Sequence, residues 1–221
     1  CNPATVSADK AKLLSEGGVN RISMGVQSLD ENLLDQLGRI HSREQVFSSF
    51  NILRQAGFKR INLDLMFAIP TQTMPQWQST LAEAVAMGSE HLSCYEVIYE
   101  QDTPLYEQLR AGEFDVQEEL ASEMFAELVN VAEANGFHQY EVANFARHNG
   151  DKAFDVPSEA CAHNVNYWRG GEYYALGPSA AGHVDRVRTT NVANTAVYCE
   201  RIESGGRAIE FSEELSPLER A

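Results

Sequence analysis

The sequence predicts an α/β fold in which strands and helices alternate over residues 1–100, followed by an α+β region over residues 101–221. Two observations predict it. Runs with strand character recur roughly every 35 residues, and residues typical of helix caps and helix ends separate them. Such repeats form right-handed βα units of a parallel sheet or barrel, in which ligands collect at the carboxyl ends of the strands.

Caps and glycines mark the elements of the first 100 residues. Each predicted helix begins after a Ser, Thr or Asp side chain that can accept a backbone N–H, and each ends near a glycine. In chain order, a helix runs from Ser7 to Gly17, a strand covers 20–26, helices run from Asp30 to Gly38 and from Ser42 to Gly57, a strand covers 60–67, a helix runs from Thr73 to near Gly88, and a strand covers 91–98.

The pattern changes after residue 100. Thr103-Pro104 begins one helix, and Asp115 with Glu118 begins a long helix that runs to Asn135-Gly136. We then expect a strand over 139–145, a long polar loop over 147–162 and Gly-rich, strand-like structure over 173–187. A loop of that length is more typical of a functional segment than of a structural one.

The composition excludes several kinds of protein. The chain has 17 Lys and Arg against 32 Asp and Glu, a net charge of −15 that disfavours binding to nucleic acid. No apolar run approaches the roughly 20 residues of a transmembrane helix and no signal peptide is visible, so we expect a cytoplasmic protein. The four cysteines lie far apart, which argues against a disulfide scaffold or a self-contained zinc site.

Both ends of the sequence indicate a longer protein. The chain opens at Cys1-Asn2-Pro3 without a Met, and residues 216–221 have the pattern of a first helical turn. We therefore expect this chain to be an interior segment, cut before or within a C-terminal region.

Three polar residues, Gln27, Arg39 and Asp64, lie near predicted strand ends or in the loops that follow them. One interpretation is that they are solvated surface groups. The other is a pocket for a small zwitterion with sugar hydroxyls, because the guanidinium of Arg suits a carboxylate while Asp and Gln suit hydroxyls. Spacing alone leaves both open.

A second group of candidates is His163-Asn164-Val165-Asn166-Tyr167-Trp168, which a Gly-rich segment over 173–183 follows. It fits an ordinary capped turn with two aromatic side chains in the core. It also fits an imidazole that ligates iron beside aromatic faces that pack on a flat macrocycle. Composition does not separate the two.

Seven segments, taken together and in order, are more specific than any of these motifs alone. They are residues 2–3, 18–28, 37–42, 57–73, 91–95, 139–144 and 163–168. They closely resemble the radical S-adenosylmethionine proteins related to oxygen-independent coproporphyrinogen III oxidase, and within that group the HemW haem-chaperone branch. The resemblance implies that residues 1–100 are the later βα units of a partial (β/α)6-type barrel.

The resemblance also implies cofactors and site residues. Family members bind a 4Fe–4S cluster through C-x-x-x-C-x-x-C, and the cluster binds S-adenosylmethionine. By motif match, Arg39 faces the carboxylate of S-adenosylmethionine, Gln27 and Asp64 hold its ribose or nearby polar atoms, and Met66 and Ile98 supply apolar contact. A further family Glu belongs directly before Cys1 and is absent here.

Haem is the other ligand that the resemblance implies, with His163, Tyr167 and Trp168 as its site. The sequence departs from the family in one respect that concerns metal: C-x-x-x-C-x-x-C is absent, so these residues include no cluster ligands. The loop over 147–162 is also longer than the family leads us to expect.

Three functions follow for consideration. The first is a haem chaperone that binds haem, the cluster and S-adenosylmethionine in the intact protein and passes haem to a client protein. The second is an enzyme, a coproporphyrinogen III oxidase that converts propionates of a porphyrinogen to vinyl groups. The third is an unrelated βα protein, which the ordered run of matches disfavours. Whether the protein is an enzyme, and its oligomeric state, stay open.

Overall fold

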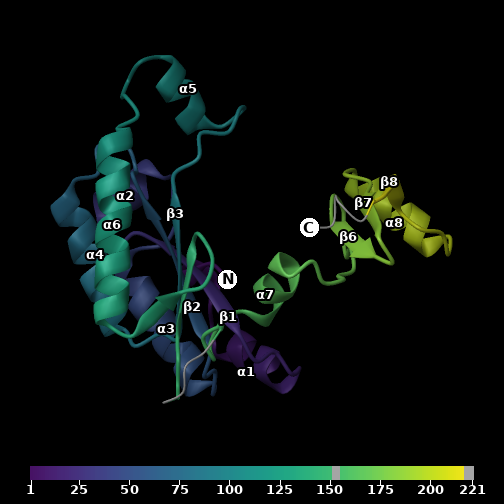
Figure 1. The fold of residues 1–221 in the computed structure, drawn as a ribbon, viewed down its shortest axis with the longest axis horizontal. Helices are drawn as coiled ribbons and strands as arrows, with labels where there is room; N and C mark the ends of the chain where they lie inside the picture. Colours follow the sequence, from purple (N-terminus) through teal and green to yellow (C-terminus); the bar gives the residue numbers. More distant parts are fainter. Residues whose placement is uncertain (151–154, 217–221) are drawn as a thin grey trace. The chain divides into compact units, whose positions relative to one another are not determined.

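The computed structural model describes residues 1–150 and 155–216, which divide into two compact units, Cys1–Ala160 and Cys161–Ala221. Figure 1 shows their elements. Within the described residues of the first unit these are the 3-10 helix η1 (Pro3–Thr5), α1 (Ala8–Glu16), β1 (Ile22–Gln27), α2 (Glu31–Gln36), α3 (Arg43–Gln55), β2 (Ile61–Phe67), α4 (Met74–Ala86), β3 (His91–Glu96), α5 (Pro104–Arg110), α6 (Glu118–Ala134), β4 (Phe137–Gln139) and β5 (Asn144–Arg147).

A five-stranded sheet in the order β1-β2-β3-β5-β4 forms the centre of the first unit. β1, β2 and β3 are parallel neighbours, as the sequence predicts, and their register places Gly25, Asp64 and Ser93 in one row. β5 joins β3 in antiparallel orientation, and β4 pairs with β5. The carboxyl ends of the three parallel strands therefore lie at one edge of the sheet.

The first three α-helices begin where the sequence places their caps. The side chain of Ser7 accepts a backbone N–H of α1, and that of Asp30 accepts two from α2. Ser42 and Gln45 form the reciprocal capping box of α3, with N–H to oxygen distances of 2.9 and 3.2 Å. These local hydrogen bonds set where each helix starts, and burial against the sheet sets where it lies.

One face of the sheet is apolar and packs against helices. Leu63, Leu65 and Phe67 alternate along β2 and are buried in one core with side chains of α3, α4 and α6. Trp77 of α4 is fully buried, and its Nε1–H donates to the backbone oxygen of Met124 in α6 at 2.8 Å. Figure 1 shows α4 and α6 side by side. The other face is thereby left free of this helical layer.

Two predicted boundaries are wrong. α6 begins at Glu118 behind Gln117, so Asp115 does not cap it, and the acidic first turn favours the helix start electrostatically instead. Residues 139–145 are not one strand, because β4 ends at Gln139 and β5 begins at Asn144. The hairpin folds back so that Phe137 and Phe145 are both buried in the same core.

The second unit contains α7 (Ala162–Trp168), β6 (Ala181–Val184), β7 (Val187–Asn191), α8 (Thr195–Glu203) and β8 (Ile209–Glu214). Its strands form an antiparallel sheet in the order β6-β7-β8. Asp185 and Arg186, both at positive φ, make the two-residue turn between β6 and β7. The predicted strand-like segment over 173–187 is therefore a bridge at Tyr173, β6 and the start of β7.

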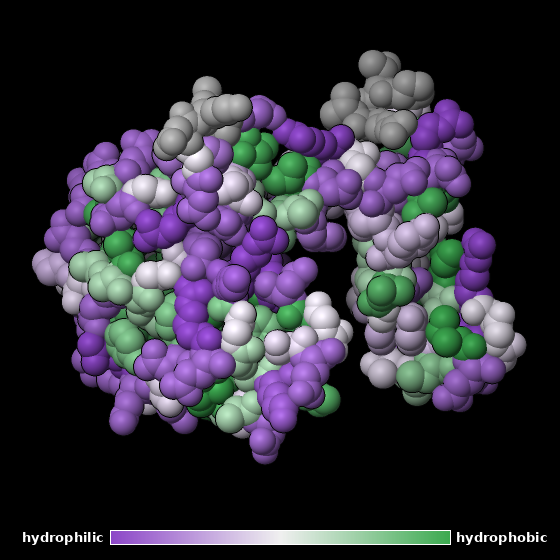
Figure 2. Space-filling view, turned by 90° about the horizontal axis from the view of Figure 1, so that it is seen from below, coloured by the Kyte–Doolittle hydropathy of each residue, from purple (hydrophilic) through white to green (hydrophobic). Residues whose placement is uncertain are grey.

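Parts of the prediction lie outside the described residues. They are residues 151–154 of the predicted loop and residues 217–221 of the predicted helical turn. The domain boundary at residue 100 stays a prediction. Figure 2 shows that hydrophilic side chains cover most of the visible surface of each unit, with smaller hydrophobic patches between them.

Candidate functional site

The face of the sheet opposite the helical core is polar. Strand residues alternate between the two faces, and neighbours in register share a face. Polar side chains therefore gather across four strands, although they are far apart in the sequence. In strand order they are Ser23 of β1, Asn62 and Asp64 of β2, His91 and Ser93 of β3 and Asn144 of β5.

Asp64 lies in the middle of this polar face with both carboxylate oxygens hydrogen-bonded. Ser23 Oγ lies 3.0 and 2.9 Å from the two oxygens, and Asn62 Nδ2 donates to Oδ1 at 2.7 Å. Burial raises the pKa of Asp64, and the hydrogen bonds from Ser23 and Asn62 oppose that rise. Asp64 is therefore a preoriented acceptor, suited to a ligand hydroxyl or N–H.

His91 is fully buried on the same face and bonded at both ring nitrogens. Nδ1 lies 2.6 Å from Asn62 Oδ1, and Nε2 lies 2.8 Å from the hydroxyl of Tyr140. Burial, with a smaller contribution from the charge of Arg21, lowers the pKa of His91 to about 3. The imidazole is therefore neutral at physiological pH.

Gln27 ends β1 in a left-handed conformation, with φ of 66°. Its side-chain amide folds back over Gly25, where a Cβ would come within 2.9 Å of Nε2. Since Gly25 is the register neighbour of Asp64, the structure brings Gln27 to the Asp64 face. The buried His41 donates from Nε2 to the backbone oxygen of Val26 at 3.0 Å and so braces this turn.

The other candidates for the same ligand differ in position. Met66 is half-buried on β2, two residues beyond Asp64 and on its face, beside Tyr95 of β3. Ile98 lies two residues after β3 and is 75% exposed. Arg39 is exposed in the loop between α2 and α3, and within the described residues its guanidinium has no hydrogen bond or ion pair. The structure thus brings Gln27, Asp64 and Met66 together and leaves two candidates on loops.

Sequence reasoning missed the side chains that support these candidates, among them Ser23, which donates to Asp64. Asn62, His91 and Tyr140 join Asp64 in one hydrogen-bond network, and His41 supports Gln27. The alternation of polar residues within otherwise apolar strands is the signal that could have found Asn62 and His91. Tyr140 carried no such signal, because the hairpin that presents it was not predicted.

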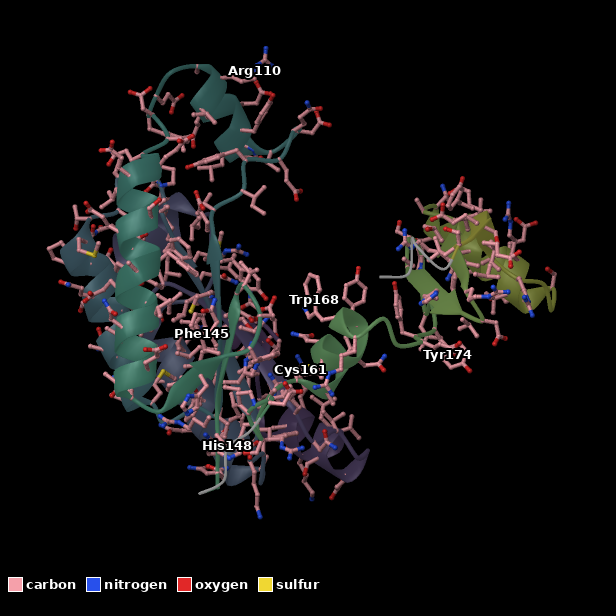
Figure 3. The ribbon with its side chains drawn as sticks, viewed as in Figure 1. Arg110, Phe145, His148, Cys161, Trp168 and Tyr174 are labelled. Atoms are coloured by element: carbon pink, nitrogen blue, oxygen red, sulfur yellow. The ribbon has the colours of Figure 1, made fainter. Side chains whose placement is uncertain are left out.

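The second candidate site lies on α7, where His163, Tyr167 and Trp168 are all exposed. Figure 3 shows Trp168 projecting from this helix. The ring of Tyr173 lies 6.4 Å from that of His163 and 5.4 Å from that of Tyr167, measured between ring centres. Tyr167 and Trp168 meet edge to face at 5.4 Å. The structure therefore gathers all three predicted haem residues into one aromatic cluster within the second unit.

Backbone contacts hold this cluster in place. Asn166 Nδ2 donates to the oxygen of Glu172 at 3.0 Å, which fastens the loop after α7. A Cβ on Gly182 would lie 2.8 Å from the backbone nitrogen of Ala175, so only glycine allows this close approach. His183 is 6% exposed beside Tyr173, and its Nε2 has no hydrogen-bond partner among the described residues. The exposed imidazole of His163 and the exposed aromatic faces beside it are a donor set that fits a haem, whereas His183 is buried.

Two kinds of feature are absent from the described residues. No group of three or more His, Cys, Asp and Glu side chains there is arranged to hold a metal ion. None of the helices in residues 1–150 and 155–216 combines the length and apolar character needed to cross a membrane.

Comparisons with known proteins agree with this architecture. Residues 1–84 match the model of the radical SAM superfamily. The chain is 35% identical to "Heme chaperone HemW" of Bacillus subtilis over 99% of this chain and 56% of that protein. It is 34% identical to "Radical S-adenosyl methionine domain-containing protein 1, mitochondrial" of Danio rerio, over 93% of this chain and 46% of that protein. The chain thus spans about half the length of these relatives.

A solved structure supports the fold. Coproporphyrinogen III oxidase (HemN) from Escherichia coli matches with a TM-score of 0.78 and 19% identity, over 97% of this chain and 50% of that one. The predicted fold class, later βα units of a radical SAM barrel with an α+β extension, is confirmed. By the match to the family model, residues 1–84 of the chain belong to the radical SAM superfamily. Within it, the chain is similar over nearly its whole length to the HemW heme chaperones.

Proposed function

We propose that this chain is part of a haem chaperone of the radical SAM superfamily. The observation that carries the proposal is the exposed cluster of His163, Tyr167 and Trp168 around Tyr173. Large aromatic side chains exposed together are unusual on a soluble surface and typical of a binding site. Similarity to proteins named heme chaperones supports haem as the ligand.

In this proposal His163 ligates the haem iron, and Tyr167 and Trp168 pack against the porphyrin. The side chain of Trp168 is 65% exposed and that of Tyr167 47% exposed, so both have surface that a flat ligand can cover. A client protein that receives the haem and a cytoplasmic location belong to the same proposal.

The polar face of the sheet is the proposed site for S-adenosylmethionine. Membership of the superfamily implies this cofactor and a 4Fe–4S cluster, which together supply radical chemistry when bound. We assign Gln27 and Asp64 to the ribose region, Arg39 to the carboxylate, and Met66 and Ile98 to apolar contact. The cluster motif C-x-x-x-C-x-x-C is not in this sequence.

Haem titration of the intact protein tests the proposal. His163→Ala should weaken binding at least tenfold, seen as a shifted titration of the Soret band, because the iron loses a ligand. Tyr174→Ala is the matched control, since this ring is 80% exposed in the same segment but outside the cluster. It should change the affinity less than twofold. Equal affinities of wild type and His163→Ala would refute the assignment.

The similarity of fold to coproporphyrinogen III oxidase keeps an enzymatic alternative. Incubation of the intact protein with coproporphyrinogen III under anaerobic, reducing conditions separates the two functions. The chaperone proposal predicts that chromatography detects no vinyl-bearing product. Formation of that product with turnover would replace the chaperone by an oxidase.

A further inference from the structure

Tyr140 is linked to Asp64 through His91 and Asn62, and the three hydrogen bonds of this series all donate towards Asp64. Asn62 Nδ2 lies 2.7 Å from Asp64 Oδ1 and donates to it, because an amide nitrogen only donates. The same Nδ2 lies 2.7 Å from Ser23 Oγ, whose own hydrogen is directed at Asp64. Both hydrogens of Nδ2 are therefore used, and the amide orientation of Asn62 is fixed.

The orientation of Asn62 fixes the tautomer of His91. Asn62 Oδ1 faces His91 Nδ1 at 2.6 Å, and an amide oxygen only accepts, so Nδ1 carries the proton. In the neutral ring Nε2 is then the acceptor, and the Tyr140 hydroxyl at 2.8 Å donates to it. Tyr140 therefore donates to His91, His91 donates to Asn62, and Asn62 donates to Asp64.

We propose that Asn62, His91 and Tyr140 are positioning residues that hold the Asp64 carboxylate for the ribose hydroxyls of S-adenosylmethionine. This inference rests on the proposed function of the sheet face. The three side chains lie on β2, on β3 and in the β4–β5 turn, so they fix the carboxylate against three separate segments. Asp64 keeps acceptor capacity beyond these bonds, because each carboxylate oxygen can accept more than one.

A purely structural role explains the network less well. Apolar side chains of similar size would pack a sheet face without the desolvation that buried polar groups require. Polar networks at binding sites instead hold the first ligand-contacting group in a single orientation, which lowers the entropy lost on binding. The network also ends at a half-buried carboxylate, which is the group that a ligand would meet.

The His91 tautomer gives a test that does not depend on any ligand. Nitrogen-15 NMR of the intact protein labelled at histidine should show His91 as a single neutral Nδ1–H tautomer. His91→Gln identifies the signal by its loss. A His91 ring protonated at Nε2, or a mixture of tautomers, would overturn the directed network.

Affinity for S-adenosylmethionine tests the positioning role, measured by calorimetry on the cluster-loaded protein. Asn62→Leu and His91→Ala should each weaken binding about tenfold, and His91→Gln, which keeps a donor and an acceptor, should restore it to within threefold. Tyr140→Phe, which changes the residue of the network farthest from Asp64, should weaken binding of S-adenosylmethionine about threefold. None of these variants should lose affinity for an analogue that lacks the ribose hydroxyls.

Ser49→Ala is the control for a general loss of stability. Ser49 is also buried and hydrogen-bonded, with Oγ 2.7 Å from the oxygen of Pro3, but it lies outside the network. It should leave the affinity unchanged. Unchanged affinity of folded Asn62→Leu and His91→Ala would overturn the positioning role alone. Absence of binding by the wild-type protein would overturn the proposed cofactor site as well.

Discussion

Replacement of His91 should change how the stability of the first unit depends on pH. In the folded chain the pKa of this imidazole is lowered from 6.5 to about 3, because the ring is buried and Arg21 is nearby. The folded state therefore binds fewer protons than the unfolded state between these two values. Stability that is present above pH 6.5 is lost as the pH falls towards 3.

The size of this loss follows from the two pKa values. A difference of about 3.5 corresponds to about 5 kcal/mol, at about 1.4 kcal/mol for each pKa unit. Between pH 7.5 and pH 4.5 the unfolded imidazole becomes almost fully protonated while the folded one stays neutral, which costs about 2–3 kcal/mol. His91→Gln cannot titrate and should lack this part of the pH dependence.

Urea unfolding at pH 7.5 and at pH 4.5 measures the effect. The chain has two tryptophans, so a Trp168→Phe background of this chain leaves the fully buried Trp77 as its one tryptophan, which reports on the first unit. Carboxyl groups titrate in both proteins, and comparison of their pH differences removes that shared contribution. The same loss of stability in wild type and His91→Gln would refute the claim that burial keeps His91 neutral.

Three further substitutions test packing and local structure. Gly182→Ala should destabilise the second unit by about 1–3 kcal/mol in thermal unfolding, because its Cβ would overlap the facing backbone; no change would contradict that close approach. Trp77→Phe should lower the free energy of unfolding by about 2–4 kcal/mol in urea unfolding followed by circular dichroism, since it opens a cavity and removes the hydrogen bond from the indole N–H to the oxygen of Met124. Ser42→Ala should lower the free energy of unfolding by about 1 kcal/mol, because α3 loses its N-terminal cap. Ser48→Ala is the control, since Ser48 is exposed in the middle of the same helix, and it should leave the free energy of unfolding unchanged.

Local chemistry explains why the helices could be predicted from the sequence. Ser7, Asp30 and Ser42 cap the helices that follow them because each hydrogen bond joins residues within one turn. The prediction failed at Asp115 and over 139–145, where the outcome depends on distant partners. The β4–β5 hairpin exists because Phe137 and Phe145 share a core with residues of other elements, and no local pattern encodes that.

The candidate site was predictable only in part for a similar reason. Gln27, Arg39 and Asp64 stood out as polar residues near strand ends, and the family resemblance added Met66 and Ile98. His91 is bonded to Asn62 only because β2 and β3 pair in one register, Asn62 beside His91. A shift of one residue in the register of β2 and β3 would turn Asn62 or His91 to the opposite face of the sheet. The chemistry of the site therefore depends on the pairing of two residues that lie 29 positions apart in the sequence.

The two candidate sites differ in the way that each would bind a ligand. Ser23 and Asn62 already hold Asp64 in one orientation. A ligand that hydrogen-bonds to Asp64 therefore does not lose binding free energy to the ordering of that side chain. The α7 cluster instead exposes its rings, and covering about 100 Å² of aromatic surface would contribute about 2–3 kcal/mol. A site of the first kind selects by hydrogen-bond geometry, whereas one of the second kind accepts flat apolar ligands and depends on His163 for specificity. Substitutions at Asp64 should therefore change which nucleoside analogues bind, while those at Trp168 should change the affinity for many porphyrins alike.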